Sequence, residues 1–412
     1  MKFLPEWWKK TEKTERNAHV LTFLLTLSIC SYQSAFISIV LGIAGAYILA
    51  DCIKKKSIRG FASDRECWFG MAVFLATVVI SSLMLGDKGS IRIALNYVYW
   101  SLPFFMIIYF MKQADVKYTV LLGVGVCILM DGLYTAYQYG LLAQGVKHIG
   151  RFGRIELFYG HPNHYAMFLI AMLPLLLFAL QDHTLQGIKR FKAADIFLIA
   201  LGLWSLLKTG SRGAFGGLAI GIFVIILIYC YRNKSVKKFL AGLVLCACVS
   251  GLMSTLMVGG MQRRYDSERL LLLQSSYAMW QDHKLLGVGL NNWEEQYQKK
   301  YIMKTAKERK LTVPHNTVAW FFTTTGVIGG AGYLFFVLYY SVLLFRKTGS
   351  EADRDRWILY AVLLSFIAVN LHGMVDVGFT HKGIARLLYL LLGFALYRSC
   401  TNNALRKQRN IV

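Results

Sequence analysis

Three short segments of the sequence place polar or cationic side chains at the start of a long apolar run. They are "HPNHYAMF" from residue 161, "GSRGAFGG" from residue 210 and "PHNTVAWF" from residue 314. The first turn of a helix leaves backbone N–H groups unpaired and lies at the positive end of the helix dipole. Anions bind at such helix starts, so these segments predict a site for an anionic group.

Arg212 and His315 carry the side chains best suited to chemistry at these helix starts. A guanidinium can bind phosphate through two hydrogen bonds, and the glycines on both sides of Arg212 allow close backbone approach. The alternative for Arg212 is an interfacial arginine that extends to lipid head groups. The helix dipole disfavours a protonated imidazole at His315, so this side chain is a candidate general base. The alternative is a histidine that only caps its helix.

The histidines of the first segment have a spacing that zinc ligands can use. His161 and His164 would need His315 and a further ligand, but no local motif completes a ligand shell around them. We therefore expect no metal. Asn163 and His164 are instead expected to shape a substrate pocket, with His161 beside them.

Two aspartates are candidates of a different kind. Asp376, in "HGMVDVGFTHK", is expected to orient a base or to hydrogen-bond a sugar, unless it is only a solvated loop residue. Asp131 lies inside an apolar run, where an ionisable group is costly and indicates function, and we expect an arginine near the outer leaflet as its partner. The motif "DRD" at residues 353–355 is expected to be surface charge at the opposite face. Because there is no P-loop, dinucleotide fingerprint or HExxH motif, we expect no cofactor.

The elements that position these residues are expected to be transmembrane helices. The chain has 412 residues, 56% of them hydrophobic and 14% aromatic, which is too apolar for an ordinary soluble domain. We predict an all-α polytopic integral membrane protein with one domain over residues 1–412. About twelve helices are expected. They begin near Ala18, Ser34, Cys67, Arg92, Tyr118, His164, Ala194, Gly213, Val236, Thr317, Trp357 and Thr380.

Charge sets the expected orientation of these helices. Basic connections near residues 54–59, 112–117, 189–192, 232–238, 346–347 and 406–409 alternate with the segments described above. The positive-inside rule places the basic connections and both termini in the cytoplasm. The three helix starts, the segment around Asp376 and a long loop over residues 259–314 then lie outside. The net charge of +24 and the basic loop predict an anionic partner.

The long loop is expected to contain helices. Ser267 would cap a helix that carries Arg269 in its first turn, and a second helical segment would begin near Trp293, with Tyr297 and Tyr301 on the same side. Such helices are expected to lie along the membrane surface with their aromatic side chains towards the lipid. Ordinary solvated amphipathic helices are the alternative.

The chain resembles, over nearly its whole length, the bacterial lipopolysaccharide O-antigen ligases and the related O-antigen polymerases. The best local matches are "TGSRGAFGGL", "SERLLLLQSSYAMWQDHKLLGVGLNNW" and "VPHNTVAWFFTTTGVIGG". The middle match points to Arg269 as the loop arginine of the family, with Arg263 and Arg264 as neighbouring alternatives. The resemblance implies a glycosyltransferase C-like fold with a large periplasmic helical loop between the ninth and tenth spans. It also implies a bacterial inner-membrane protein whose site faces the periplasm.

The resemblance further implies transfer of a completed glycan from undecaprenyl pyrophosphate to a sugar hydroxyl of the lipid A-core, without nucleotide or metal. His315 would be the general base, and Arg212 and Arg269 would neutralise the leaving diphosphate. Asn316 would lie beside His315 at the membrane boundary, because both substrates are lipids. The implied partners are the carrier-linked donor, the lipid A-core acceptor and membrane lipids, and no nucleic acid is expected.

Three other functions remain open from the sequence. A polymerase would use the same donor and add the glycan to another carrier-linked repeat, or a related enzyme would glycosylate a protein. We favour the ligase because a basic chain suits a phosphorylated core. A secondary transporter would predict internal repeats and broken helices near the midplane, whereas the candidates here gather at one face and only Asp131 favours transport.

Overall fold

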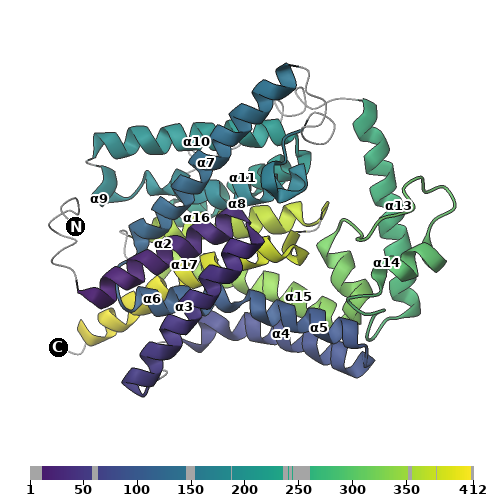
Figure 1. Cartoon of the computed structure of the whole chain (residues 1–412), viewed down its shortest axis with the longest axis horizontal. Helices are drawn as coiled ribbons and strands as arrows, with labels where there is room; N and C mark the ends of the chain where they lie inside the picture. The colour runs from purple at the N-terminus through teal and green to yellow at the C-terminus, as the bar shows by residue number, and fades with distance from the viewer. Residues whose placement is uncertain are drawn as a thin grey trace.

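The computed structural model describes most of the chain as helices joined by short connections (Figure 1). The described residues are 12–57, 64–144, 154–186, 188–234, 240, 244, 260–350, 355–376 and 378–409. The elements are α2 (Lys13–Ser31), α3 (Ser34–Lys55), α4 (Arg65–Leu85), α5 (Lys88–Trp100), α6 (Leu102–Met111), α7 (Lys117–Ala143), η2 (Leu157–Tyr159), α8 (Pro162–Ala179), α9 (His183–Gln186), α10 (Lys189–Thr209), α11 (Arg212–Asn233), α13 (Gly260–Asp282), α14 (Trp293–Gln296), η3 (Tyr297–Tyr301), α15 (Thr317–Ser350), α16 (Arg356–His372), η4 (Gly378–Thr380) and α17 (Lys382–Arg409).

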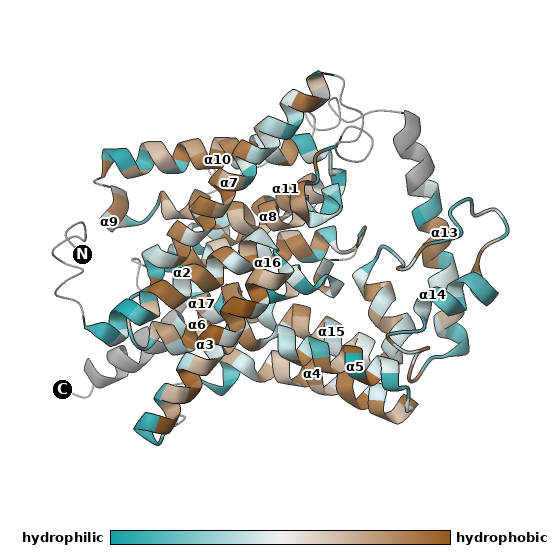
Figure 2. Ribbon diagram, in the orientation of Figure 1, coloured by the Kyte–Doolittle hydropathy of each residue, from teal (hydrophilic) through white to brown (hydrophobic). Residues whose placement is uncertain are grey.

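The described helices are those of a multi-pass membrane protein. Seven of them within the described ranges are long and apolar enough to cross a bilayer, with α5 and α6 counted together as one span. Figure 2 shows hydrophobic colouring along the bundle and more hydrophilic colouring around α13 and α14. Helices occur at each predicted start except that near Val236, which lies outside the described residues. The polytopic α-helical class is therefore confirmed, and the total of twelve stays a prediction.

The centre of the bundle is formed by α8, α16 and the first part of α17, whose side chains are buried along most of their length. Glycines allow α11 to lie directly against α16. A Cβ atom at Gly217 would lie 2.5 Å from the carbonyl oxygen of Ala368, and one at Gly221 would lie 2.7 Å from a methyl carbon of Leu364. Small residues permit such close approach in membrane helix pairs. The start of α11 is thereby fixed next to the end of α16.

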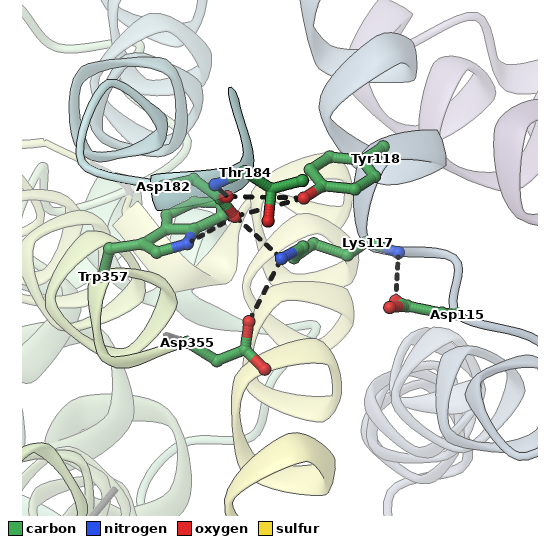
Figure 3. A network of polar contacts seen from close by, with 7 residues as sticks. All are labelled: Asp115, Lys117, Tyr118, Asp182, Thr184, Asp355 and Trp357. Atoms are coloured by element: carbon green, nitrogen blue, oxygen red, sulfur yellow. Dashed lines mark hydrogen bonds and ion pairs between the residues drawn. The ribbon is translucent and has the colours of Figure 1, made fainter. Parts of the chain in front are cut away.

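A buried ion-pair network joins α7, the segment after α8 and the start of α16 (Figure 3). The Nζ atom of Lys117 lies 2.7 Å from Asp182 and 3.2 Å from Asp355. Asp182 also accepts hydrogen bonds from the indole of Trp357 and the hydroxyl of Tyr118. Asp355 was expected to be surface charge, but its side chain is only 14% exposed and pairs with Lys117. The expectation was wrong because the partner is distant in sequence; Asp353 lies outside the described residues.

The long loop forms a small structure of its own. Its helix α13 begins at Gly260, well before the expected cap at Ser267. The second segment is helical only over α14 and η3. Trp293, Tyr297 and Tyr301 share one side as predicted, but they are buried in a cluster with residues of α13. These aromatic side chains therefore do not face lipid, because they are part of the apolar core of the loop.

The loop is joined to α15 through a break in that helix. At Gly326, φ is 62° and ψ is −160°, so the helical ladder is interrupted. The N–H of Val288 donates to the carbonyl of Thr323 at 2.8 Å, and that of Val327 donates to the carbonyl of Lys284 at 2.8 Å. The backbone groups released by the break are thus paired with residues 284–289 of the loop, as buried backbone groups require.

The two ends of the bundle carry different structural elements. In Figure 1, α2 begins and α17 ends at the left, whereas α13 and α14 lie at the right. The helices α8, α11 and α15 begin at the right-hand end, and α16 ends there. The three helix starts predicted from the sequence therefore lie at the end that carries the loop, and the Lys117 network lies at the other.

Candidate active site

One cavity at the loop end of the bundle brings most of the predicted residues together. Its volume is about 630 Å³, and it is enclosed by the starts of α8, α11 and α15, the connection from α16 to α17, and α13. The predicted residues that line it are His161, Asn163, His164, Arg212, Arg269, His315 and Asp376. Side chains that are far apart in sequence thus form a single polar site.

His315 and Asp376 form a hydrogen-bonded pair on one wall of this cavity. The Nδ1 atom of His315 lies 3.2 Å from Oδ1 of Asp376. When Nδ1 carries the proton and donates it to the carboxylate, Nε2 is the basic nitrogen of the ring. The backbone of His315 has φ of 49°, a left-handed conformation that is uncommon outside glycine. Strained backbone of this kind is often found at functional sites.

Asp376 is buried, and its charge is balanced from several sides. Its side chain is 2% exposed, accepts a hydrogen bond from the Nδ2 amide of Asn163, and lies 3.9 Å from the guanidinium of Arg269. Burial alone would raise the pKa of Asp376, but the hydrogen bond from His315 and the charges of His315, His372 and Arg269 hold it well below its ordinary value. These partners favour the ionised form of Asp376, and its burial against His315 shows that it is not a solvated loop residue.

Arg154 extends this arrangement and was not predicted. Its Nη2 donates to the side-chain oxygen of Asn163 at 2.7 Å, and its Nε donates to the carbonyl of Thr209 at 2.6 Å. A chain of hydrogen bonds therefore runs from Arg154 through Asn163 to Asp376. This chain fixes the orientation of the Asn163 amide, so that its NH₂ group faces the carboxylate. No motif in the sequence marks Arg154, which stands seven positions before His161.

Several cationic side chains also line the cavity. Arg212 is the first residue of α11, directly after Ser211, and Arg269 projects from α13 with 33% of its side chain exposed. Lys310, also unpredicted, comes from the segment that leads to His315. Two arginines and a lysine in the cavity that the first turn of α11 borders suit an anion with several oxygens, such as a diphosphate.

The histidines at the start of α8 have separate structural contacts. His161 caps α8 by accepting a hydrogen bond from the N–H of Asn163 at 3.1 Å. The ring of His164 lies 4.4 Å from that of His381, centroid to centroid, and both line the cavity. Burial, together with the charges of His164 and Lys382, holds the pKa of His381 well below its ordinary value. Among the described residues, no group of three or more His, Cys, Asp or Glu side chains is arranged to hold a metal ion.

Asn316, a further predicted site residue, does not line the cavity. Asn316 is buried behind it, where its Oδ1 accepts from the N–H of Ala319 and its Nδ2 donates to the carbonyl of Met374. It therefore caps α15 and ties it to the connection after α16. Arg263 and Arg264 lie in α13, but their side chains are outside the described residues.

Asp131 has a different partner from the one expected. Its carboxylate accepts a hydrogen bond from the hydroxyl of Tyr159 at 2.7 Å, and the thiol of Cys127 lies 3.8 Å away. The expectation of an arginine was wrong, because a connection between spans folds back into the bundle and supplies a neutral donor at this depth. Asp131 does not line the cavity.

The fold and the cavity define a multi-pass membrane protein with a histidine–aspartate pair and several cations in one polar site. Residues 197–334 match the family model described as O-antigen ligase, and this match supports membership of the chain in the O-antigen ligase family. The matched segment includes Arg212, Arg269 and His315, whereas Asp376 and Asn163 lie outside it. The match supports a transferase of the O-antigen ligase or polymerase type in general. No curated protein matches the chain.

Proposed function

We propose that the protein is an O-antigen ligase that transfers a glycan from undecaprenyl pyrophosphate to a sugar hydroxyl of the lipid A-core. The reaction would take place at the periplasmic face of the bacterial inner membrane and would need no metal ion. The observation that carries this proposal is the His315–Asp376 pair in the same cavity as Arg212 and Arg269. The family match supports the reaction class.

The transfer is a direct displacement at the anomeric carbon of the donor sugar. The acceptor hydroxyl oxygen forms a bond to C1 while the bond between C1 and the carrier phosphate oxygen breaks, and the diphosphate leaves with the electron pair. The hydroxyl proton passes to Nε2 of His315. Asp376 holds Nδ1 protonated and stabilises the imidazolium that forms. Attack opposite the leaving group inverts the configuration at C1.

The cations act on the leaving group. Negative charge grows on the bridging oxygen as the C1–O bond breaks, and preorganised cations lower the energy of this state without reorganising. Arg212 at the start of α11 and Arg269 on α13 reach the cavity from different elements, which suits a diphosphate held between them. Since these two side chains supply positive charge, the proposed mechanism assigns no step to a metal.

The alternative function, an O-antigen polymerase, differs from the ligase only in the acceptor. A polymerase would use the same donor, cations and base, but the attacking hydroxyl would belong to a second carrier-linked repeat. The net positive charge of the loop over residues 259–314 favours the ligase, because a phosphorylated core carries more negative charge near the reacting sugar. A transporter is disfavoured, because the polar groups of the cavity gather at one end of the bundle and not at its midplane.

The test is a transfer assay with purified protein, undecaprenyl pyrophosphate-linked glycan and lipid A-core, in detergent with a chelator and without nucleotide. We expect wild type to form the core-linked product and His315→Ala to lose roughly 10²–10⁴-fold in rate. His283→Ala is the matched control, because His283 is exposed on the same loop and does not line the cavity. Growth of carrier-linked chains without product on the core would identify a polymerase. Full activity of a folded His315→Ala variant would refute the assigned base.

A further inference from the structure

Next to the cavity, α17 carries a buried arginine that the proposed mechanism does not use. Arg386 is 6% exposed, and its Nε atom is fully covered without a hydrogen-bond acceptor. Its guanidinium carbon lies 5.2 Å from the centre of the Tyr99 ring of α5. Among the described residues, no carboxylate pairs with Arg386. A buried guanidinium is costly unless charged or hydrogen-bonding groups compensate it, and a ring face supplies no acceptor.

A purely structural explanation is that the Arg386 side chain extends along the helix to reach water. The burial of Arg386 argues against it, because an extended side chain of this kind keeps its head group exposed. An ionisable side chain within a membrane-spanning bundle is costly and therefore indicates a functional contact. The missing acceptor is the feature that a bound anion would supply.

Further cationic and aromatic groups surround Arg386. Lys382 lies one turn earlier on α17, and its Nζ atom is 5.9 Å from the centre of the Tyr32 ring. Gly383 makes room for that ring, since a Cβ atom there would lie 2.4 Å from Tyr32. Lys382 and Arg386 thus occur at an i, i+4 spacing on one side of α17, between Tyr32 of the α2 end and Tyr99 of α5.

This cluster adjoins the cavity through one aromatic ring. The Tyr32 ring lies 4.7 Å from the ring of His381, centroid to centroid, and His381 lines the cavity. The Nδ1 atom of His381 is also buried without a partner. On its other side the cluster reaches the surface of the bundle, because Tyr99 is 38% exposed on a helix that packs against α17. The groups therefore extend from the surface of α5 to the wall of the cavity.

We propose that Lys382 and Arg386, between Tyr32 and Tyr99, form a second anion subsite that binds the phosphate or diphosphate group of a lipid substrate. A phosphate supplies the acceptors that Arg386 lacks, and a lipid tail can remain in the bilayer beside α5 while its head group lies next to the cavity. This inference rests on the proposed function for the identity of its ligands. The carrier diphosphate and the phosphates of lipid A both have the anionic oxygens that such a subsite would bind.

Binding of lipids without transfer tests the subsite. Full-length protein in nanodiscs is titrated with undecaprenyl diphosphate, with undecaprenol, with lipid A-core and with dephosphorylated lipid A-core. We expect Arg386→Gln to weaken binding of one phosphorylated lipid roughly tenfold and Arg386→Lys to weaken it less, because a charged hydrogen bond is lost in the first case only. The lipid whose affinity falls identifies the source of the phosphate. The two lipids without phosphate should be unaffected.

Controls separate the subsite from folding and from catalysis. Lys208→Gln removes a different cation that lies over an aromatic ring, that of Tyr139 at 3.7 Å, and should leave binding unchanged. If Arg386→Gln does not fold, Lys382→Gln takes its place with the same expected direction. Unchanged affinity of a folded variant for both phosphorylated lipids would overturn the subsite. If Arg386→Gln loses lipid binding while His315→Ala retains glycan transfer, the assignment of His315 as the base is wrong. The anion subsite at Arg386 is still supported by that result.

Discussion

The imidazole of His315 and the carboxylate of Asp376 lie 3.2 Å apart although the two residues are 61 positions apart in the chain. One belongs to the segment before α15 and the other to the connection after α16. Asn316 holds the two segments together through its hydrogen bond to the carbonyl of Met374, at 2.7 Å. The N–H of Thr317 adds a second link, to the carbonyl of Gly373 at 2.7 Å. The pair is therefore fixed by one side-chain and one backbone hydrogen bond from the residues that follow His315.

Replacement of Asp376 by asparagine should reduce kcat by roughly 10²–10⁴-fold with a smaller change in KM. The amide has a similar shape, but it cannot stabilise the imidazolium or hold one tautomer. The measurement is the rate of glycan transfer at saturating donor and acceptor. Asp282→Asn is the matched control, because this aspartate of α13 is exposed and pairs with Lys300. A kcat equal to that of wild type would mean that Asp376 does not act through His315.

The pH dependence of stability should also reveal the lowered pKa of Asp376. Its folded-state pKa lies well below the ordinary value of 3.8. A depressed carboxyl pKa stabilises the fold above the unfolded-state pKa, and this contribution is lost as pH falls towards the folded-state pKa, because the unfolded chain takes up the proton first. The apparent Tm difference between wild type and Asp376→Asn should stay constant above about pH 5 and shrink below about pH 4. A difference that shrinks near neutral pH would contradict this assignment.

Arg269 should be more sensitive to loss of charge than to change of shape. Arg269→Met should lower kcat/KM for the donor by roughly 10²–10³-fold, because a cation that stabilises the leaving diphosphate is lost. Arg269→Lys should retain part of the activity through its charge but lose the paired hydrogen bonds. Arg309→Met removes the same charge from an exposed loop position that does not line the cavity. Equal losses in Arg269→Met and Arg309→Met would indicate a general charge effect and not a specific contact.

Gly326→Ala should destabilise the junction between the loop and α15. A Cβ atom at this position would lie 2.1 Å from the carbonyl oxygen of Leu285, and the positive φ disfavours any residue with a side chain. We expect a loss of about 2 kcal/mol or more in stability and faster proteolysis of the loop in folded protein. Gly42→Ala is the control, because a Cβ atom there meets nothing within 4 Å. Unchanged proteolysis would show that the loop is held by other contacts.

Lys117→Met should destabilise the opposite end of the bundle. It leaves the buried Asp182 and its neighbour Asp355 without their shared cation, and breaking a buried pair costs roughly 3–5 kcal/mol. Lys55→Met is the control, since Lys55 is 55% exposed in its pair with Asp51. The double variant Lys117→Met with Asp182→Asn should recover part of the lost apparent Tm, because one uncompensated charge is removed. No recovery would argue against an electrostatic cause.

Local sequence patterns were sufficient to predict the helix starts and the residues they carry. Arg212 and His315 are recognisable because each stands where a polar segment meets an apolar run. The contacts between segments could not be predicted, because nothing near Asn163 in the chain indicates that Arg154 and Asp376 would lie on its two sides. The burial of Trp293 was also missed, since an aromatic stripe on one helix face fits a lipid surface and a small core equally well.

The break in α15 also constrains the order in which the protein is made. Residues 284–289 precede Gly326 in the chain, so during synthesis they leave the ribosome before the helix that they complete. A helix with unpaired backbone groups is costly in lipid. Residues 284–289 therefore have to be in place when α15 enters the bilayer, so that an earlier part of the chain serves as the assembly factor for a later one.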